Sequence, residues 1–177
     1  MEDNMQEKLI CVDIFDREIG SAEKLEAHQK CLLHRAFSVF LVQDGKMLIQ
    51  RRAAHKYHSG GKWANACCSH PRVGEDLPTA TRRRLQEELN LEGIGLEELY
   101  GFVYCHRFED GLWEYEYDHV FVGQCDQTPD LNPEEADACR WVDYDELAQE
   151  LLEHPDRFAV WFRICAPRVL AWLKEQQ

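Results

Sequence analysis

The stretch that decides the fold covers residues 69–91, SHPRVGEDLPTATRRRLQEELNL. Leu77-Pro78-Thr79 opens a helix that should run to about Leu89, because proline is favoured in the first helical turn. At helical spacing, several small or charged side chains of this segment lie close together: Ala80, Arg84, Glu87 and Glu88. The pattern predicts a loop followed by a helix that presents acids and arginines.

The remaining elements are read from apolar patterning and turn signals. Residues 36–42 and 47–51 are predicted as a hairpin around Asp44-Gly45, followed by a loop over residues 53–63. Residues 99–107 and 113–122 are predicted as two more strands, joined by a turn at residues 109–111. Helices are predicted over residues 143–152, capped by Asp143 or Asp145, and over residues 156–173, interrupted or kinked at Pro167. This order favours an α+β fold in one domain, residues 1–177, with a mixed sheet sandwiched between helices.

Composition excludes several functional classes. The chain has 177 residues, 45% hydrophobic and 30% charged, with a formal net charge of −13. Nucleic-acid binding needs a basic face, so it is not expected. The apolar stretches are too short for membrane insertion. Residues 1–8 are acidic and polar, which predicts a disordered start and no export signal. We therefore expect a cytoplasmic protein whose partner is a small molecule, as a monomer or weak homodimer.

Eight cysteines in such a chain are expected to be reduced thiols. Cys31 and most of the others are expected to be structural, and a further set is predicted to be buried as small apolar side chains: Cys11, Cys125, Cys139 and Cys165.

Two acids and three histidines form a candidate metal site. Glu114 and Glu116 would project from the same face of a strand, where they repel each other unless a cation or shared proton relieves them. With His28, His34 and His70 they would suit Mn²⁺, Mg²⁺ or Zn²⁺. The alternative is a solvated carboxylate face, a surface His28 and a hydrogen-bonded core His34. The other histidines are given structural roles: His55, His58, His106, His119 and His154.

Residues 69–91 can be laid on the Nudix signature, which holds a Mg²⁺–diphosphate between a loop and a helix with carboxylates as hard ligands. With Ser69 on the first glycine position, six residues match the signature: Glu75, Arg83, Leu85, Glu87, Glu88 and Leu91. Ser69 and Asn90 replace glycines, and Arg84 replaces an acid that helps to activate water in the hydrolases. A guanidinium can neither bind a metal nor act as a base. Diphosphate binding should survive this change, and hydrolysis should not.

Three motifs carry a closer resemblance: LHRAFS at residues 33–38, WANACCSHP at residues 63–71 and WEYE at residues 113–116. They resemble type I isopentenyl-diphosphate isomerase, an offshoot of the Nudix fold, from about Lys24 to Trp161. The resemblance implies an enzyme that interconverts isopentenyl and dimethylallyl diphosphate by protonation and deprotonation, through a tertiary carbocation. The rival interpretations are a Nudix diphosphate hydrolase and a non-catalytic binding module.

The resemblance also implies residue roles. Glu116, helped by Tyr104 and polarised by a metal, is the expected acid, Cys68 as a thiolate is the expected base, and Cys67 has no role. The protein-bound metal would be held by His28, His34, His70, Glu114 and Glu116. A second ion, the Mg²⁺ that enters with the substrate diphosphate, would be bound by Glu88 and the backbone carbonyl of Cys68. The residues expected to bind the rest of the substrate are Lys24, Arg52, Lys56, Ser69, Arg84 and, over the isoprene unit, Trp161.

Overall fold

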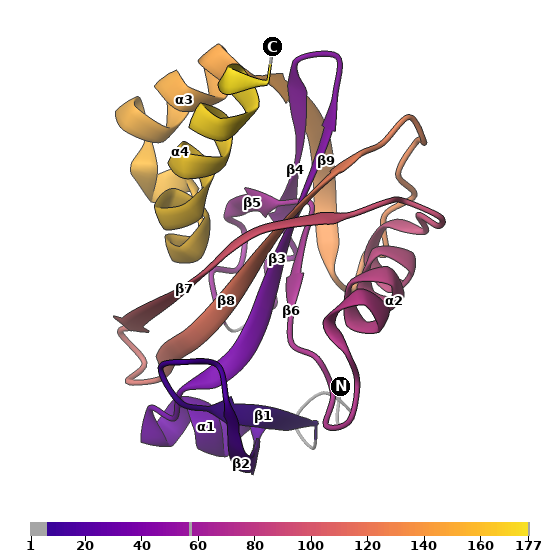
Figure 1. Ribbon diagram of the computed structural model, residues 1–177. Helices are drawn as coiled ribbons and strands as arrows, with labels where there is room; N and C mark the ends of the chain where they lie inside the picture. The colour runs from indigo at the N-terminus through magenta and orange to yellow at the C-terminus, as the bar shows by residue number, and fades with distance from the viewer. Residues whose placement is uncertain (1–6, 57, 177) are drawn as a thin grey trace.

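The computed structural model describes residues 7–56 and 58–176 of the chain (Figure 1). Nine strands form one mixed sheet. They are β1 (Lys8–Val12), β2 (Glu18–Glu23), β3 (His34–Gln43), β4 (Lys46–Arg52), β5 (Trp63–Asn65), β6 (Cys67–Ser69), β7 (Glu97–Arg107), β8 (Trp113–Gln124) and β9 (Ala136–Asp143). The helices are α1 (Lys24–Lys30), α2 (Leu77–Leu89), α3 (Tyr144–Glu153) and α4 (Val160–Glu175), with a short 3₁₀ turn, η1 (Pro155–Arg157).

Strand β3 is the centre of the sheet. It pairs antiparallel with β1, β4 and β6, and parallel with β8. The parallel register places His34 beside Glu116, and the β7–β8 hairpin places Tyr104 opposite the same Glu116. Because side chains of a strand alternate between faces, this register brings the alternate acids of β8 to one side of the sheet.

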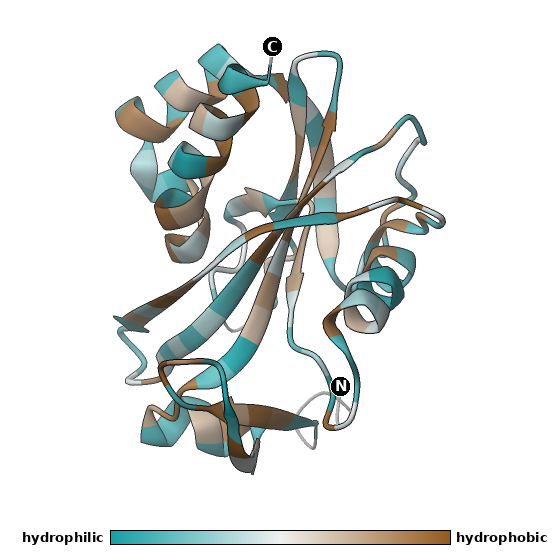
Figure 2. Ribbon diagram, in the orientation of Figure 1, coloured by the Kyte–Doolittle hydropathy of each residue, from teal (hydrophilic) through white to brown (hydrophobic). Residues whose placement is uncertain are grey.

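Helices cover both faces of the sheet (Figure 1). On one face α3 and α4 pack Leu147 and Phe162 against Phe40 of β3 and Ile49 of β4. On the other face α2 packs Leu85 and other apolar side chains against the opposite side of β3 and β4. Helices α3 and α4 show alternating hydrophobic and hydrophilic bands, as expected for helices with one buried side (Figure 2). The predicted α+β sandwich is therefore confirmed.

Helix α2 has the predicted bounds, and its ends explain why. Asp76 caps the start by accepting a hydrogen bond from the Thr79 amide at 2.7 Å, and Pro78 lies in the first turn. Asn90 ends the helix in the left-handed conformation, with φ of 53°. Asp143 caps α3 in the same way, by accepting a hydrogen bond from the Asp145 amide at 2.9 Å.

Several sequence predictions need correction. The C-terminal helix begins at Val160 and not near 156, because Pro155 starts a separate 3₁₀ turn, and α4 continues through Pro167. Strand β9 and the whole segment β1–β2–α1 were not predicted. Lys8 opens β1, so the predicted disorder does not extend to it; residues 1–6 lie outside the described residues. Cys139 is only half-buried, whereas the other three cysteines of that set are buried. Within the described residues, no helix is long and apolar enough to cross a bilayer.

Candidate functional site

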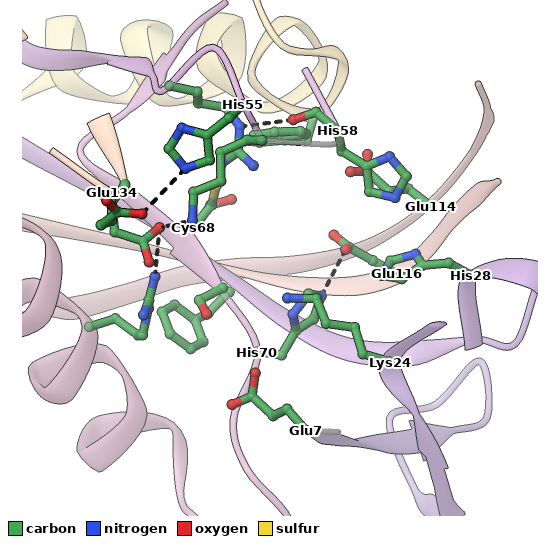
Figure 3. A pocket seen from close by; sticks show the side chains of 18 residues that line it. Glu7, Lys24, His28, His55, His58, Cys68, His70, Glu114, Glu116 and Glu134 are labelled. Atoms are coloured by element: carbon green, nitrogen blue, oxygen red, sulfur yellow. Dashed lines mark hydrogen bonds and ion pairs between the residues drawn. The ribbon is translucent and has the colours of Figure 1, made fainter. Parts of the chain in front are cut away.

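A cavity of about 560 Å³ is lined by side chains from α1, from the sheet and from the connection that carries His55 and His58 (Figure 3). Eleven of the residues predicted for the site line it: Lys24, His28, Arg52, Lys56, Cys68, Ser69, His70, Arg84, Glu114, Glu116 and Trp161. Three predicted residues lie behind this wall and contact it, namely His34, Tyr104 and Glu88. Segments far apart in sequence therefore meet around one cavity.

Three histidines from three different segments cluster on one side of the cavity. One ring nitrogen each of His28, His34 and His70 lies within 4.8 Å of the others. His28 Nδ1 is 2.7 Å from the carbonyl of Trp113, and His34 Nδ1 is 2.8 Å from that of Leu32. These bonds fix both rings and turn their Nε2 atoms toward the cluster. His28 is only 1% exposed, so the alternative of a surface histidine is wrong.

The chemistry of this cluster suits a divalent metal ion. Burial lowers the pKa of His28, and it lowers the pKa of His70 to about 3. Neutral imidazoles are the form that binds metals. Among the described residues, the buried His70 Nδ1 atom has no hydrogen-bond partner, and His34 Nε2 reaches only a Glu116 oxygen, at 3.5 Å. Buried polar atoms without a partner destabilise a fold. A metal ion bound by the three converging rings would give their nitrogens a partner.

Two carboxylates of β8 complete this side of the cavity. Glu116 Oε1 is 3.0 Å from His70 Nε2 and 3.5 Å from His34 Nε2. The Tyr104 hydroxyl donates to Glu116 Oε2 at 2.7 Å and also lies 3.1 Å from Glu114 Oε2. Burial alone would raise the pKa of Glu116, but hydrogen bonds to His34 and His70 outweigh it and lower that pKa. Burial and the Glu116 carboxylate raise the pKa of Glu114. Glu116 is therefore the ionised member of the pair.

The two adjacent cysteines have different surroundings. The Cys68 side chain lines the cavity, where its Sγ lies 3.7 Å from Arg52 Nη1. Cys67 points to the other side of β6, is fully buried, and lies 3.4 Å from a carboxylate oxygen of Glu88. Burial raises the pKa of Cys68 well above its ordinary value, although Arg52 opposes this shift. These surroundings favour the thiol form of Cys68, whereas the sequence prediction has this residue act as a thiolate.

Basic side chains gather at the opposite end of the cavity and are held by acids. Arg84 Nη2 lies 2.6 Å from Glu88 Oε1 and 3.3 Å from Glu135 Oε2. Lys56 Nζ lies 2.5 Å from the same Glu135 oxygen. Glu135 thus bridges two cations, and their charges outweigh the effect of burial to lower its pKa. This end of the cavity can bind an anion that shares or displaces the Glu135 contacts.

Trp161 forms part of the cavity wall beside Arg52. It is 4% exposed, and its indole Nε1 donates to Asn65 Oδ1 at 3.1 Å. The Arg52 guanidinium lies 5.2 Å from the centre of the indole ring. Trp161 also packs within the α3–α4 core, so its indole is held rigidly while it lines the cavity.

Sequence reasoning missed some residues of the site. His58 is 4% exposed and stacks on Phe108, with its ring centre 4.9 Å from that of His28. Glu135 and Asn65 contact predicted residues, as described above, and Asp118 accepts a hydrogen bond from Ser38 at 2.8 Å within the core. The spacing of Asp118 from Glu114 and Glu116 could have revealed it. His58 and Glu135 lie in loops with no pattern that marks them.

Comparisons with known proteins agree with this geometry. The NUDIX domain family model matches residues 32–162. The chain is 45% identical to isopentenyl-diphosphate Delta-isomerase 2 of Aromatoleum aromaticum, over 94% of this chain and 88% of the relative. It is 46% identical to the isopentenyl-diphosphate Delta-isomerase of Burkholderia multivorans, over 93% of each.

Among solved structures, DR0079 from Deinococcus radiodurans covers 92% of this chain and 98% of its own, with a TM-score of 0.76 at 20% identity. That likeness establishes the fold alone. The two sequence relatives match nearly the full length of the chain at more than 40% identity, and they therefore establish its family within that fold. The chain belongs to the isopentenyl-diphosphate Delta-isomerase family, within the Nudix superfamily.

Proposed function

We propose that this chain interconverts isopentenyl diphosphate and dimethylallyl diphosphate by adding a proton to one carbon and removing one from another. The observation that carries the proposal is a thiol and a carboxylate that line one cavity, Cys68 and Glu116, with the Tyr104 hydroxyl bonded to Glu116 from behind the cavity wall. Moving the double bond of an unactivated alkene needs an acid and a base of this kind.

The protonation states indicate how such a pair works. Cys68 as a thiol and Glu116 as a carboxylate are one proton donor and one acceptor, with the Tyr104 hydroxyl bonded to the acceptor. When a proton moves onto the alkene from one side and leaves the substrate to the other, the donor and acceptor exchange states. Between turnovers Glu116 gives its proton to solvent and Cys68 takes one up, which resets the pair. The same two groups with their roles exchanged serve the reverse reaction, and a tertiary carbocation lies between the two transfers.

The rest of the cavity would protect that cation. The Trp161 indole offers a π face, and cation–π attraction is worth roughly 2 kcal/mol when desolvated. Its hydrogen bond to Asn65 fixes the ring.

The metal centre would use His28, His34 and His70, with Glu114 and Glu116 as the two oxygen ligands, and would hold Mn²⁺, Mg²⁺ or Zn²⁺. When bound, such an ion would offset the repulsion between the two carboxylates and favour the ionised form of Glu116. Burial and the Glu116 carboxylate raise the pKa of Glu114, so Glu114 is the carboxyl that would lose its proton when a metal binds.

The basic end would bind the diphosphate. Arg84 and Lys56 are its main charged contacts, with Lys24, Arg52 and Ser69 nearby along the cavity wall. Glu88 and the Cys68 carbonyl would meet a Mg²⁺ that enters with the substrate. Because Glu88 and Glu135 already neutralise Arg84 and Lys56, the accompanying Mg²⁺ would compensate these acids and let the anion bind.

Hydrolysis, as in other Nudix proteins, is the alternative function. It needs a carboxylate at the position of Arg84, and here the guanidinium instead bonds Glu87 and Glu88, which occupies the remaining acids of the helix. The helix therefore lacks a free carboxylate cluster for activating water.

One experiment separates the two reactions. Isopentenyl diphosphate is incubated in D₂O with the protein, Mg²⁺ and Mn²⁺, and followed by NMR, with a phosphate assay on the same sample. Isomerisation introduces deuterium into the new methyl group of dimethylallyl diphosphate and releases no phosphate. Catalytic release of phosphate with unlabelled carbon would overturn the proposal.

Paired variants test the residues. Cys68→Ala should lose turnover by at least about 10³-fold, since general acid–base catalysis contributes 10² to 10⁴-fold. Cys67→Ser keeps a hydrogen-bond donor beside Glu88 and should remain active. Equal loss in the two variants, with unchanged thermal unfolding, would contradict the role given to Cys68.

A further inference from the structure

A second pair of cysteines lies outside the cavity. The Sγ atoms of Cys31 and Cys105 are 3.8 Å apart, although 74 positions separate them in the sequence. Cys31 is half-buried and Cys105 is exposed. Within the described part of the chain, no other two thiols make a sulfur–sulfur contact of this kind. The pair is therefore set apart from the buried, isolated cysteines.

The backbone around the pair brings the two thiols together. Cys31 ends α1 in the left-handed conformation, with φ of 54° and ψ of 49°, where glycine or asparagine is the usual residue. Cys105 is on β7 directly after Tyr104. Because alternate strand residues face opposite ways, Tyr104 turns inward and Cys105 turns outward. The bonds of β8 to β7 and of His28 to Trp113 hold the two segments side by side.

We propose that Cys31 and Cys105 form an intramolecular disulfide when the protein meets a peroxide or a small-molecule disulfide. A sulfur–sulfur bond measures about 2.05 Å, so the atoms must approach by roughly 1.8 Å, which side-chain rotation and a small shift of the short α1 can supply. Cys105, the exposed thiol, is the entry point for the oxidant.

The chemistry balances with hydrogen peroxide. Peroxide oxidises the Cys105 thiol to a sulfenic acid and releases one water. The Cys31 sulfur then attacks the sulfenic sulfur, the sulfur–sulfur bond forms, and the hydroxyl leaves as a second water. Two thiols are oxidised and one peroxide is reduced. A small-molecule disulfide would instead give two thiols by exchange through a mixed disulfide on Cys105.

The bond would clamp a weakly held element that carries site residues. Helix α1 has only seven residues and no side-chain cap at its start, and it bears Lys24 and His28. Short uncapped helices open readily. The bond would join its end to β7, next to Tyr104, and close a loop over residues 31–105. The oxidised protein should therefore keep α1 ordered where the reduced protein lets it open.

Oxidation of the full-length protein tests this proposal. After treatment with one equivalent of peroxide and blocking of free thiols, intact-mass and peptide mapping should show the loss of two hydrogens in a peptide pair that contains Cys31 and Cys105. The melting temperature should rise on the order of 10 °C, because the closed loop is long. Dithiothreitol should reverse both changes. Hydrogen exchange in α1 should slow in the oxidised form.

Single variants provide the controls. Cys31→Ser and Cys105→Ser should melt like the reduced wild type and show no rise on oxidation, whereas Cys125→Ser should behave as the wild type does. A wild-type protein that yields only Cys105 sulfinic acid or intermolecular dimers would overturn the proposal. So would a bond that leaves the exchange of α1 unchanged. These readouts need no substrate, so they are independent of the proposed isomerase activity.

Discussion

At the scale of single residues, His58 shows how the site is supported from behind. Its ring lies between Phe108, stacked at 4.4 Å between ring centres, and His28 at 4.9 Å. Burial lowers the pKa of His58 to about 3, so the ring is neutral and packs as an aromatic surface. Its backbone carbonyl also accepts a hydrogen bond from Arg52 at 3.1 Å. His58 thus links the metal-site wall to a cation of the diphosphate end.

We predict that His58→Ala weakens binding of Mn²⁺ or Zn²⁺ by roughly 10-fold, because residues that orient metal ligands contribute factors of 10 to 100. His58→Phe retains a ring against Phe108 and His28 and should recover most of the affinity. Competition against a chromogenic chelator measures both. If the two variants lose affinity equally, the imidazole nitrogens of His58 matter and its packing role is wrong.

At the scale of elements, α2 and the loop before it are held together by one ion pair. The Arg83 guanidinium binds both carboxylate oxygens of Glu75 at 2.8 Å, and its Nη2 lies 3.4 Å from the carbonyl of His70. This bidentate pair joins the helix to the loop that presents His70. The hydrogen bond to Arg83 lowers the pKa of Glu75 and outweighs the effect of burial.

We predict that Glu75→Gln lowers the free energy of unfolding by about 1–2 kcal/mol at neutral pH. Since the folded-state pKa of Glu75 is below its ordinary value of 4.5, its contribution is fully present above that pH. It is lost as the pH falls through the folded-state value. Urea unfolding of both proteins across this range should show the gap closing in acid. Glu87→Gln, which removes a more exposed partner of Arg83, should cost less than about 1 kcal/mol.

The elements that sequence could predict are those with a strong local signal. Helix α2 was placed correctly because Asp76, Pro78 and Asn90 mark its ends within the chain itself. The β1–β2 hairpin was not predicted, because the strand Glu18–Glu23 is short, polar and mostly exposed. Helix α1 escaped because seven residues without a capping side chain carry little periodicity. Strand β9 was not predicted, because its composition is not typical of a strand. It forms through pairing with β4 along its length, a distant contact that a local sequence pattern does not reveal.

The same contrast holds for the site. His70, Cys68 and Glu116 lie in dense motifs and could be named from sequence, although their grouping rests on the β3–β8 and β3–β6 pairings. His58 and Glu135 could not be predicted, because each becomes part of the site only through contacts with distant segments. The resting state of the Cys68 thiol also depended on burial, which a sequence does not display.

At the scale of the whole molecule, the three histidines tie together α1, β3 and the end of β6, so metal binding should stabilise the complete fold. We predict that Zn²⁺ or Mn²⁺ at about 100 times the dissociation constant adds roughly 2.7 kcal/mol. For a chain of this size that raises the melting temperature by about 5–10 °C. Scanning calorimetry with and without metal measures the shift.

His70→Ala removes one ligand and should abolish most of that shift while it keeps a cooperative transition. Lys56→Ala, at the diphosphate end of the same cavity, should retain the full shift. A rise of the same size in the His70 variant would place the stabilising ion elsewhere on the molecule.

The parallel pairing of β3 with β8 has a consequence for how the protein folds. It joins positions about eighty residues apart, such as Ser38 and Asp118, and it sets His34 beside Glu116. Closing so long a loop is entropically costly, and topologies rich in distant contacts fold slowly. The local β3–β4 hairpin and α2 can form first, but neither holds a complete ligand set. The protein should therefore bind metal only late in refolding, when the last sheet contacts form. The rate at which metal binding appears would then report the rate at which β8 pairs with β3.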